Sequence, residues 1–176
     1  MALLNSATDA ERSRLVRKLQ SIGDVTADEQ LALMQVPMRI HALEKNVDIV
    51  QEGERPSNCC LLLSGFIVRY KGLSNGRRQI LSFHSPGDIP DLQSLHLHTF
   101  DHNVATLVQS RVAFIKHDAI RNLIDRFPRL GCLFWRDTLI DAAIFREWMV
   151  GLGRRTAQPP RGAGRRRPER GYHCGC

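Results

Sequence analysis

Four histidines lie close together near the middle of the chain, and imidazole is a common metal ligand. They are His84, His96, His98 and His102. In an extended segment His96 and His98 would point to one side, because residues two apart share a face of a strand. With His102 and the carboxylate of Asp91 or Asp101, they would form a nitrogen and oxygen site for zinc or another divalent cation. Their spacing matches no established metal motif, so a loop of surface histidines is the alternative, and we predict no metal cofactor.

Other residues with chemical potential are the cysteines. No serine is paired with a histidine by any recognisable pattern, and the His-Glu-x-x-His and Cys-x-x-Cys motifs are absent, so we predict that the protein is not an enzyme. The five cysteines are odd in number and lack a framework spacing, which indicates free thiols in a reducing, cytoplasmic compartment. Cys59 and Cys60 are neighbours in a predicted strand, so we expect them to face opposite sides and to be buried.

The positive charge of the chain is concentrated at its C-terminus. The formal net charge is +7, and residues 151–176 carry seven arginines against one acidic residue, Glu169, so the first 150 residues carry only +1. This C-terminal stretch is rich in glycine and proline and has few large apolar residues, so it cannot bury enough surface to offset its ordering entropy. We therefore predict a nearly neutral folded body and a disordered basic tail over 154–176.

Two short helices are predicted in the first 36 residues. Thr8 to Glu11 and Thr26 to Glu29 both match the capping box, in which a hydroxyl and a glutamate satisfy free amides at the start of a helix. Apolar residues follow each cap at helical spacing.

The segment from Met38 to Ile115 alternates short apolar runs with turn residues. Asn75-Gly76 predicts a hairpin with a type I′ turn. Many short strands with turns at this interval predict a β-barrel or sandwich. The predicted strands are 38–42, 48–51, 59–63, 66–71, 78–84, 103–107 and 111–115.

Helical spacing returns after Ile115. A short helix over 118–126 is predicted to end before Pro128, which then begins a longer helix to about Val150. Two apolar stripes on that helix need two partners, so we predict that it packs on the β body and also pairs with its own copy in a homodimer. A single wide core face in a monomer is the alternative. The stripe assigned to the dimer is Leu133, Ile140, Ile144 and Trp148, and the other is Trp135, Leu139, Ala142 and Met149.

Four glycines recur at nearly even spacing through the strand region, at Gly53, Gly65, Gly76 and Gly87. The intervals of 12, 11 and 11 residues place each at a predicted turn, where a tight corner needs positive φ or the absence of Cβ. With the order of helices and strands, this series resembles the cyclic-nucleotide-binding domain of Crp/Fnr-type transcription regulators. The resemblance implies an α+β, mainly β fold, in which a jelly-roll β-roll (a double-stranded β-helix) is flanked by N-terminal helices and a long C-terminal dimerisation helix.

The resemblance also implies a division of the chain. Residues 1–36 would be an N-terminal helical segment, 37–127 the cyclic-nucleotide-binding-like β-roll, and 128–153 the dimerisation helix. Residues 154–176 stand where family members have a winged helix-turn-helix, and no apolar periodicity follows Gln158. We therefore expect a chain truncated before its DNA-binding domain. Its tail is then either the product of a reading-frame change or a native arm that contacts DNA phosphates without reading their sequence.

In cyclic-nucleotide-binding members, an acidic residue binds the ribose and an arginine binds the phosphate near the last of these glycines. Asp91 stands where the resemblance places the acid, but no lysine or arginine occurs from Gln79 to Ser110. Burying a phosphate without a cation is costly, so we predict that cyclic AMP does not bind unless Arg77 or Arg78 reaches the pocket. The candidate residues of the effector pocket are Leu81, Phe83, Gly87, Asp88, Ile89, Asp91, Leu92, Asp101, His102 and Asn103.

The sequence therefore predicts the effector-sensing and dimerisation domain of a Crp/Fnr-family regulator with an unidentified small-molecule effector. The implied mechanism is a shift of the long helices that repositions DNA-binding domains in a full-length relative. A cupin-like metal-dependent enzyme or a metal sensor that uses the four clustered histidines is the alternative.

Overall fold

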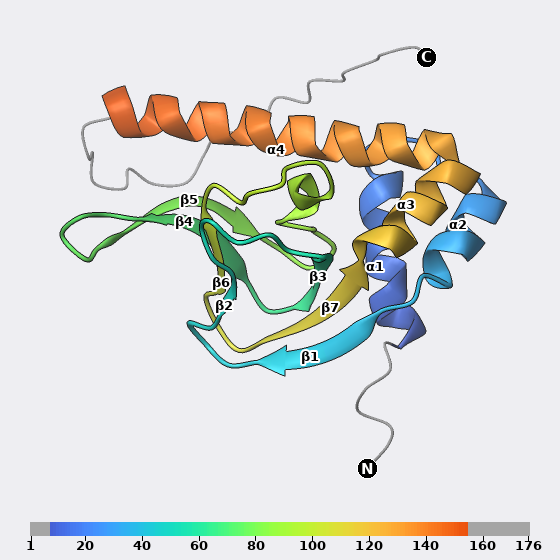
Figure 1. The fold of residues 1–176 in the computed structure, drawn as a ribbon. Helices are drawn as coiled ribbons and strands as arrows, with labels where there is room; N and C mark the ends of the chain where they lie inside the picture. Colours follow the sequence, from blue (N-terminus) through green and yellow to red (C-terminus); the bar gives the residue numbers. More distant parts are fainter. Residues whose placement is uncertain (1–7, 155–176) are drawn as a thin grey trace, which may run out of the picture.

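The computed structural model describes residues 8–154, so most of the predicted basic tail, with Cys174 and Cys176, lies outside it. One long helix runs across the top of a β-roll in Figure 1, and three shorter helices gather at one end of the roll. Within the described residues no helix is long and apolar enough to cross a membrane. The helices are α1 (Asp9–Gln20), α2 (Ala27–Met34), α3 (His117–Arg126) and α4 (Pro128–Arg154), with a short 3-10 helix, η1 (Leu92–Leu95).

Both N-terminal helices begin at the predicted capping boxes. The hydroxyl of Thr8 accepts a hydrogen bond from the Glu11 amide at 3.2 Å, and the Glu11 carboxylate accepts from the Thr8 amide at 2.9 Å. Thr26 and Glu29 make the same pair of bonds at the start of α2, at 3.3 and 2.8 Å. Each pair satisfies two amides that have no partner inside the helix, which fixes where the helix starts.

In the part of the chain that the structure describes, seven strands form two antiparallel sheets, with strand orders β1-β7-β3 and β2-β6-β4-β5. The sheets do not close into one barrel, and consecutive strands repeatedly cross between them, as in a jelly roll. The predicted mainly β fold with flanking helices is confirmed. The strands are β1 (Arg39–Leu43), β2 (Asp48–Val50), β3 (Asn58–Ser64), β4 (Ile67–Gly72), β5 (Arg78–His84), β6 (Asn103–Thr106) and β7 (Ser110–Lys116).

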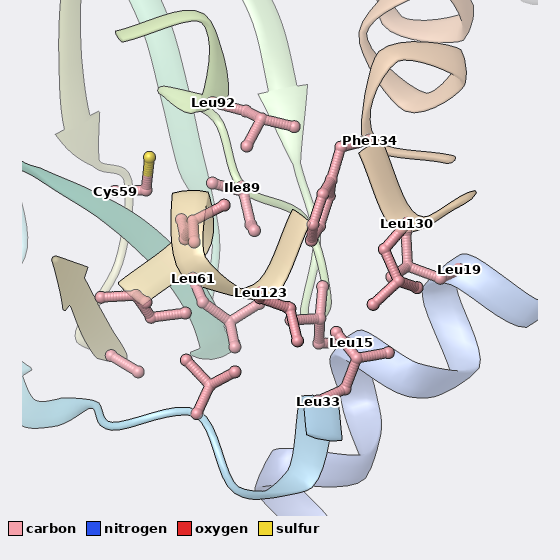
Figure 2. Packing of buried hydrophobic residues seen from close by; sticks show 14 of the residues in the cluster. Leu15, Leu19, Leu33, Cys59, Leu61, Ile89, Leu92, Leu123, Leu130 and Phe134 are labelled. Carbon is pink, nitrogen blue, oxygen red and sulfur yellow. The ribbon is translucent and has the colours of Figure 1, made fainter. Parts of the chain in front are cut away.

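Strand β3 separates two apolar cores. Cys59 and Leu61 face the helices, whereas Cys60 and Leu62 face the interior of the roll. The two cysteines therefore point to opposite sides, as predicted from their adjacency. Figure 2 shows the helical side, where leucines of α1, α2, α3 and α4 converge on β3. Because both faces of β3 are covered, its central residues form a continuous apolar run without polar alternation.

The hairpin between β4 and β5 forms as predicted, but its turn is of another type. Gly76 has a positive φ of 77°, and Asn75 does not. The Gly76 amide donates to the Leu73 carbonyl at 2.9 Å, and the Leu73 amide donates to the Arg77 carbonyl at 2.8 Å. This is a three-residue loop, in which a type I turn is followed by a left-handed glycine. The type I′ prediction is wrong because that turn closes a two-residue loop.

The long helix α4 has three faces. Leu133 is 6% exposed and lies in the core shared with the other helices, so its predicted place in a dimer contact is wrong. The other members of that stripe, Ile140, Ile144 and Trp148, border a cavity against β5 and so face the β-roll of their own chain. These three side chains are nevertheless 37%, 52% and 42% exposed. In the second stripe Trp135, Leu139 and Met149 are exposed and Ala142 is half-buried. We call it the outer stripe of α4, made of Trp135, Leu139, Ala142 and Met149.

Candidate functional site

A cavity of about 90 Å³, here called the α4 cavity, lies between β5 and the inner face of α4. Its apolar wall includes the rings of Phe83 and Trp148, whose centroids are 5.4 Å apart and whose planes are inclined by 51°. Four consecutive residues of β5, from Leu81 to His84, border it. The apolar residues around it are Leu81, Phe83, Ile89, Ile140, Ile144, Phe145 and Trp148, and the polar ones are Lys18, Arg69, Ser82, His84, Asp88, Asp137, Thr138 and Asp141.

Arg69 of β4 brings a guanidinium group to this cavity. Its Nε donates to the Pro90 carbonyl at 2.6 Å, and one terminal nitrogen donates to Gln93 Oε1 at 3.4 Å. The other terminal nitrogen forms an ion pair with the carboxylate of Asp141 on α4. The side chain of Arg69 is only 14% exposed. Every nitrogen of the guanidinium therefore has an oxygen partner within the protein.

Lys18 of α1 is the second cation of the cavity. Its Nζ lies 2.6 Å from Asp88 Oδ1 and 3.3 Å from Asp137 Oδ1. Burial is the largest single effect and opposes the charge on Lys18, but the hydrogen bonds and charges of Asp88 and Asp137 together outweigh it, so the pKa of Lys18 is raised. Burial also acts against Asp88, whose pKa is nevertheless lowered by Lys18 and by the Ser85 amide. The pKa of Asp137 is raised, because burial outweighs the more distant lysine.

His84 adds no positive charge to the cavity at neutral pH. Its Nε2 lies 2.8 Å from the hydroxyl of Ser82, and its side chain is 5% exposed. Burial, and then the positive charge of Arg69, lower the pKa of His84 to about 4. Three carboxylates, those of Asp88, Asp137 and Asp141, thus face two cations. The polar groups of the cavity carry one net negative charge, a poor environment for an added anion.

The structure separates the predicted pocket residues into two groups. Leu81, Phe83, Asp88 and Ile89 border the α4 cavity. Gly87, at a φ of 106°, forms the turn beside it, and its Cα packs near the backbone of Arg14. The remaining candidates, described next, do not border it.

Asp91 does not border the α4 cavity, and it is buried, with 1% of its surface exposed. Both of its carboxylate oxygens accept from the Cys60 amide, at 2.8 and 3.0 Å. Burial raises its pKa to about 6. Leu92 lies in the helix-side core next to it. Asp91 therefore holds the η1 segment against β3, and it does not offer a carboxylate to the α4 cavity as the sequence suggested.

Asp101, His102 and Asn103 lie at the start of β6. His102 Nδ1 is 2.8 Å from Asp101 Oδ1, and its Nε2 is 3.4 Å from the amide nitrogen of Gln93. Burial lowers the pKa of His102. The Asn103 side chain accepts from the Glu52 amide at 3.0 Å. Of the three, only His102 contacts Gln93, which in turn accepts from Arg69. Asn103 donates instead to the Tyr70 carbonyl of the neighbouring strand.

The clustered histidines do not form the hypothesised metal site. His96 and His98 are exposed after η1, whereas His84 and His102 are buried with different partners. Over residues 8–154 no group of three or more histidine, cysteine, aspartate or glutamate side chains is arranged to hold a metal ion. The enzyme alternative that depended on such a site has no support there.

One catalytic pattern is present in the letters of the sequence but not in the fold. Gly72-Leu73-Ser74-Asn75-Gly76 has the spacing Gly-x-Ser-x-Gly, which marks the nucleophile of many hydrolases when it joins a strand to a helix. Here it forms the exposed β4–β5 hairpin loop, which joins two strands. The structural context that would activate Ser74 is absent from this loop.

Sequence reasoning missed the charged residues of the cavity. Arg69, Asp137 and Asp141 were not considered, and Arg77 and Arg78 were considered instead. The Arg78 guanidinium lies 4.4 Å from the centre of the Tyr70 ring, and neither Arg77 nor Arg78 borders the cavity. The available signals were one arginine within an apolar strand, and two aspartates four residues apart on the inner face of α4.

The comparison with protein families decides which family this fold represents. Residues 40–127, half of the chain, match the family described as the cyclic nucleotide-binding domain. The chain belongs to that family, as a Crp/Fnr-type domain. A curated relative, the nitrogen fixation regulation protein FixK of Azorhizobium caulinodans, is 26% identical over 137 residues, which are 76% of this chain and 54% of FixK. The Crp/Fnr-type domain therefore spans about half the length of that relative.

Solved structures agree with the Crp/Fnr-type fold. A cyclic nucleotide-binding domain from Methylobacillus flagellatus KT is 20% identical, with a TM-score of 0.69 over 88% of this chain and 89% of that one. FixK2 from Bradyrhizobium japonicum is 24% identical, with a TM-score of 0.64 over 69% of this chain and 61% of FixK2. At these identities the similarity establishes the fold and leaves the ligand open.

Proposed function

We propose that this chain is the effector-sensing and dimerisation part of a Crp/Fnr-family transcription regulator. The observation that carries the proposal is the position of α4. Its inner face borders the α4 cavity, while its outer stripe is apolar and exposed. A ligand in the cavity would therefore touch the same helix that meets a second subunit, which is what coupling between two sites requires.

The outer stripe has the spacing of a helix pair. Trp135, Leu139 and Met149 are 68%, 56% and 56% exposed. With Ala142 and Arg146, these positions alternate by four and three residues, which is the repeat of a two-stranded coiled coil. A second copy of α4 related by two-fold symmetry would cover the stripe, because the same patch then meets itself.

We propose that the effector is a small molecule other than cyclic AMP. The α4 cavity holds about 90 Å³, well below the ~300 Å³ at which ligand pockets begin. Both of its cations are already paired with carboxylates, so a cyclic phosphate would have to displace one of these carboxylates before it met a positive group. These features support the prediction made from the missing downstream arginine.

The chain divides, in this proposal, into the helical segment 1–36, the β-roll 37–127 and the dimerisation helix 128–153. DNA is proposed as a partner of a longer protein that carries this domain together with a DNA-reading domain. Family membership favours regulation over catalysis, since Crp/Fnr-type proteins are transcription regulators.

Analytical ultracentrifugation tests the dimer. We expect the wild-type chain to sediment as a dimer at micromolar concentration and Leu139→Glu to sediment as a monomer, because a buried unpaired charge at the seam is costly. Leu31→Glu is the matched control, since Leu31 is 60% exposed on α2, away from the outer stripe, and we expect it to stay dimeric. A wild-type monomer, or equal dissociation by both variants, would contradict the proposal.

A further inference from the structure

We propose that the guanidinium of Arg69 is an anion-binding group of the α4 cavity and that the carboxylate of Asp141 occupies it in this structure. An organic anion would bind to Arg69 by displacing that carboxylate. This inference rests on the proposed sensing function and gives its effector a chemical class. It also assigns Asp141 a role as a built-in competitor of the ligand.

The guanidinium of Arg69 is held in place without Asp141. Its Nε is fixed by the Pro90 carbonyl and a terminal nitrogen by Gln93, both outside α4. Its remaining terminal nitrogen faces the cavity and is taken by Asp141. A planar, mostly buried guanidinium held by Pro90 and Gln93 is preorganised to receive a carboxylate or phosphate.

Asp141, in contrast, depends on Arg69. The ion pair is the one hydrogen-bonded contact of its carboxylate within the described part of the chain, and its side chain is 27% exposed. It lies on α4, one turn after Asp137. A small rotation of α4 away from β5 would carry the carboxylate into solvent, where its charge is hydrated.

The charge balance of the cavity favours exchange over addition. Two cations face three carboxylates, and Asp137 is destabilised as an anion by burial and by the nearby charges of Asp88 and Asp141. A monoanion that replaces Asp141 leaves the number of charges around Arg69 unchanged.

The walls of the cavity define the rest of the ligand. Phe83 and Trp148 offer two aromatic surfaces at its rim, so a flat apolar body next to the anionic group would gain contact there. The present volume of about 90 Å³ equals roughly three water molecules. Entry of such a ligand therefore requires α4 to move outward, which the exchange at Arg69 would permit. Lys18 still holds Asp137, so the movement would begin beyond that residue.

Isothermal titration calorimetry with phenyl phosphate at pH 5, where this ester is mainly a monoanion, tests the exchange. We expect Asp141→Asn to bind phenyl phosphate at least tenfold more tightly than the wild-type chain, and the double variant Arg69→Gln/Asp141→Asn to lose this gain. Asp141→Ser should behave like Asp141→Asn, which protects the test against misfolding of one variant. Inorganic phosphate, the same anion without a ring, should bind more weakly than phenyl phosphate.

Asp137→Asn is the matched control. It removes a negative charge from the same face of α4 but leaves Arg69 paired, so we expect less than a threefold gain. An equal gain in Asp137→Asn and Asp141→Asn would show general electrostatics and overturn the proposal, as would no gain in Asp141→Asn and Asp141→Ser. Sedimentation of the same samples separates the two hypotheses, because an intact dimer without anion binding rejects only the role of Asp141.

Discussion

Asp91 shows how one buried carboxylate can serve the structure and not the ligand. Among residues 8–154 no cation lies at hydrogen-bonding distance from it, and its two oxygens share the Cys60 amide. Burial raises its pKa from 3.8 to about 6, so at neutral pH the folded protein carries an ionised group that would be more stable in water. The cost is tolerated because the carboxylate ties the segment before η1 to the middle of β3.

The pH dependence of stability should reveal this buried charge. Because the pKa of Asp91 is raised in the folded state, its contribution to the free energy of unfolding is largest below pH 4 and is lost as the pH rises through about 6. The side-chain oxygen of Asn in Asp91→Asn can still accept from the Cys60 amide. We expect the free energy of unfolding of this variant to rise by about 2 kcal/mol relative to that of the wild type when the pH is raised from 4.5 to 7.5. Urea unfolding at the two pH values measures the difference.

The comparison with wild type is needed because His84 titrates in the opposite direction. The pKa of His84 is lowered, so its contribution to the free energy of unfolding is lost as the pH falls toward 4. Asp28→Asn, in the exposed first turn of α2, should keep the wild-type profile. Parallel profiles for wild type and Asp91→Asn would show that Asp91 is not destabilised by its burial.

At the scale of elements, the four evenly spaced glycines all adopt positive φ between strands, at 89°, 95°, 77° and 106° along the chain. Their surroundings differ. At Gly65 an added Cβ would lie 2.8 Å from both the Gln109 carbonyl and the Ser110 backbone, whereas at Gly53 nothing lies within 4 Å. Gly65 is therefore required by both conformation and packing, and Gly53 by conformation alone.

Alanine substitution should separate the two requirements. We expect Gly53→Ala to lower the free energy of unfolding by about 1–2 kcal/mol, the cost of a left-handed alanine. Gly65→Ala should cost at least about 2 kcal/mol more, because β7 must shift to admit the methyl group. Chemical denaturation of both variants gives the comparison. Equal losses would mean that the turn at Gly65 relaxes without strain.

The elements themselves were largely predictable from local patterns. Capping boxes, Pro128 and the glycine spacing placed most helix and strand boundaries within a residue or two. The role of each face of α4 was not predictable, since both stripes are apolar and helical spacing does not say which one meets the β-roll. The structure places Leu133 in the core and leaves Trp135 exposed, which reverses the predicted assignment for these two residues. The other members of the predicted dimer stripe border the α4 cavity and are still more than one third exposed.

At the scale of the whole molecule, the two cores meet at β3 and depend on each other. Cys59 belongs to the helix-side core and Cys60 to the interior of the roll, and both are 0% exposed. Burial, and then the charge of Asp91, raise the pKa of both thiols. Cys59 can react only once the helices leave β3, and Cys60 only once the interior of the roll opens.

Alkylation should therefore report global unfolding. With iodoacetamide and peptide mapping by mass spectrometry, we expect the exposed Cys132 to be modified quickly in the native protein. Cys59 and Cys60 should be protected and should become reactive together at the denaturant concentration of global unfolding. Early labelling of Cys59 alone would show that the helices detach from the roll as a separate unit.

The sequence by itself determined the elements, the family resemblance and the absence of a phosphate-binding arginine after β5. These features depend on residues close together in the chain, where periodicity and turn chemistry act directly. Only the tertiary structure decided the chemistry of the α4 cavity. Lys18, Arg69 and Asp141 come from three elements far apart in sequence, and their pairing depends on how those elements pack. The interaction energy of a charged side chain depends on which groups lie near it in space, and these neighbours are set only once the chain has folded.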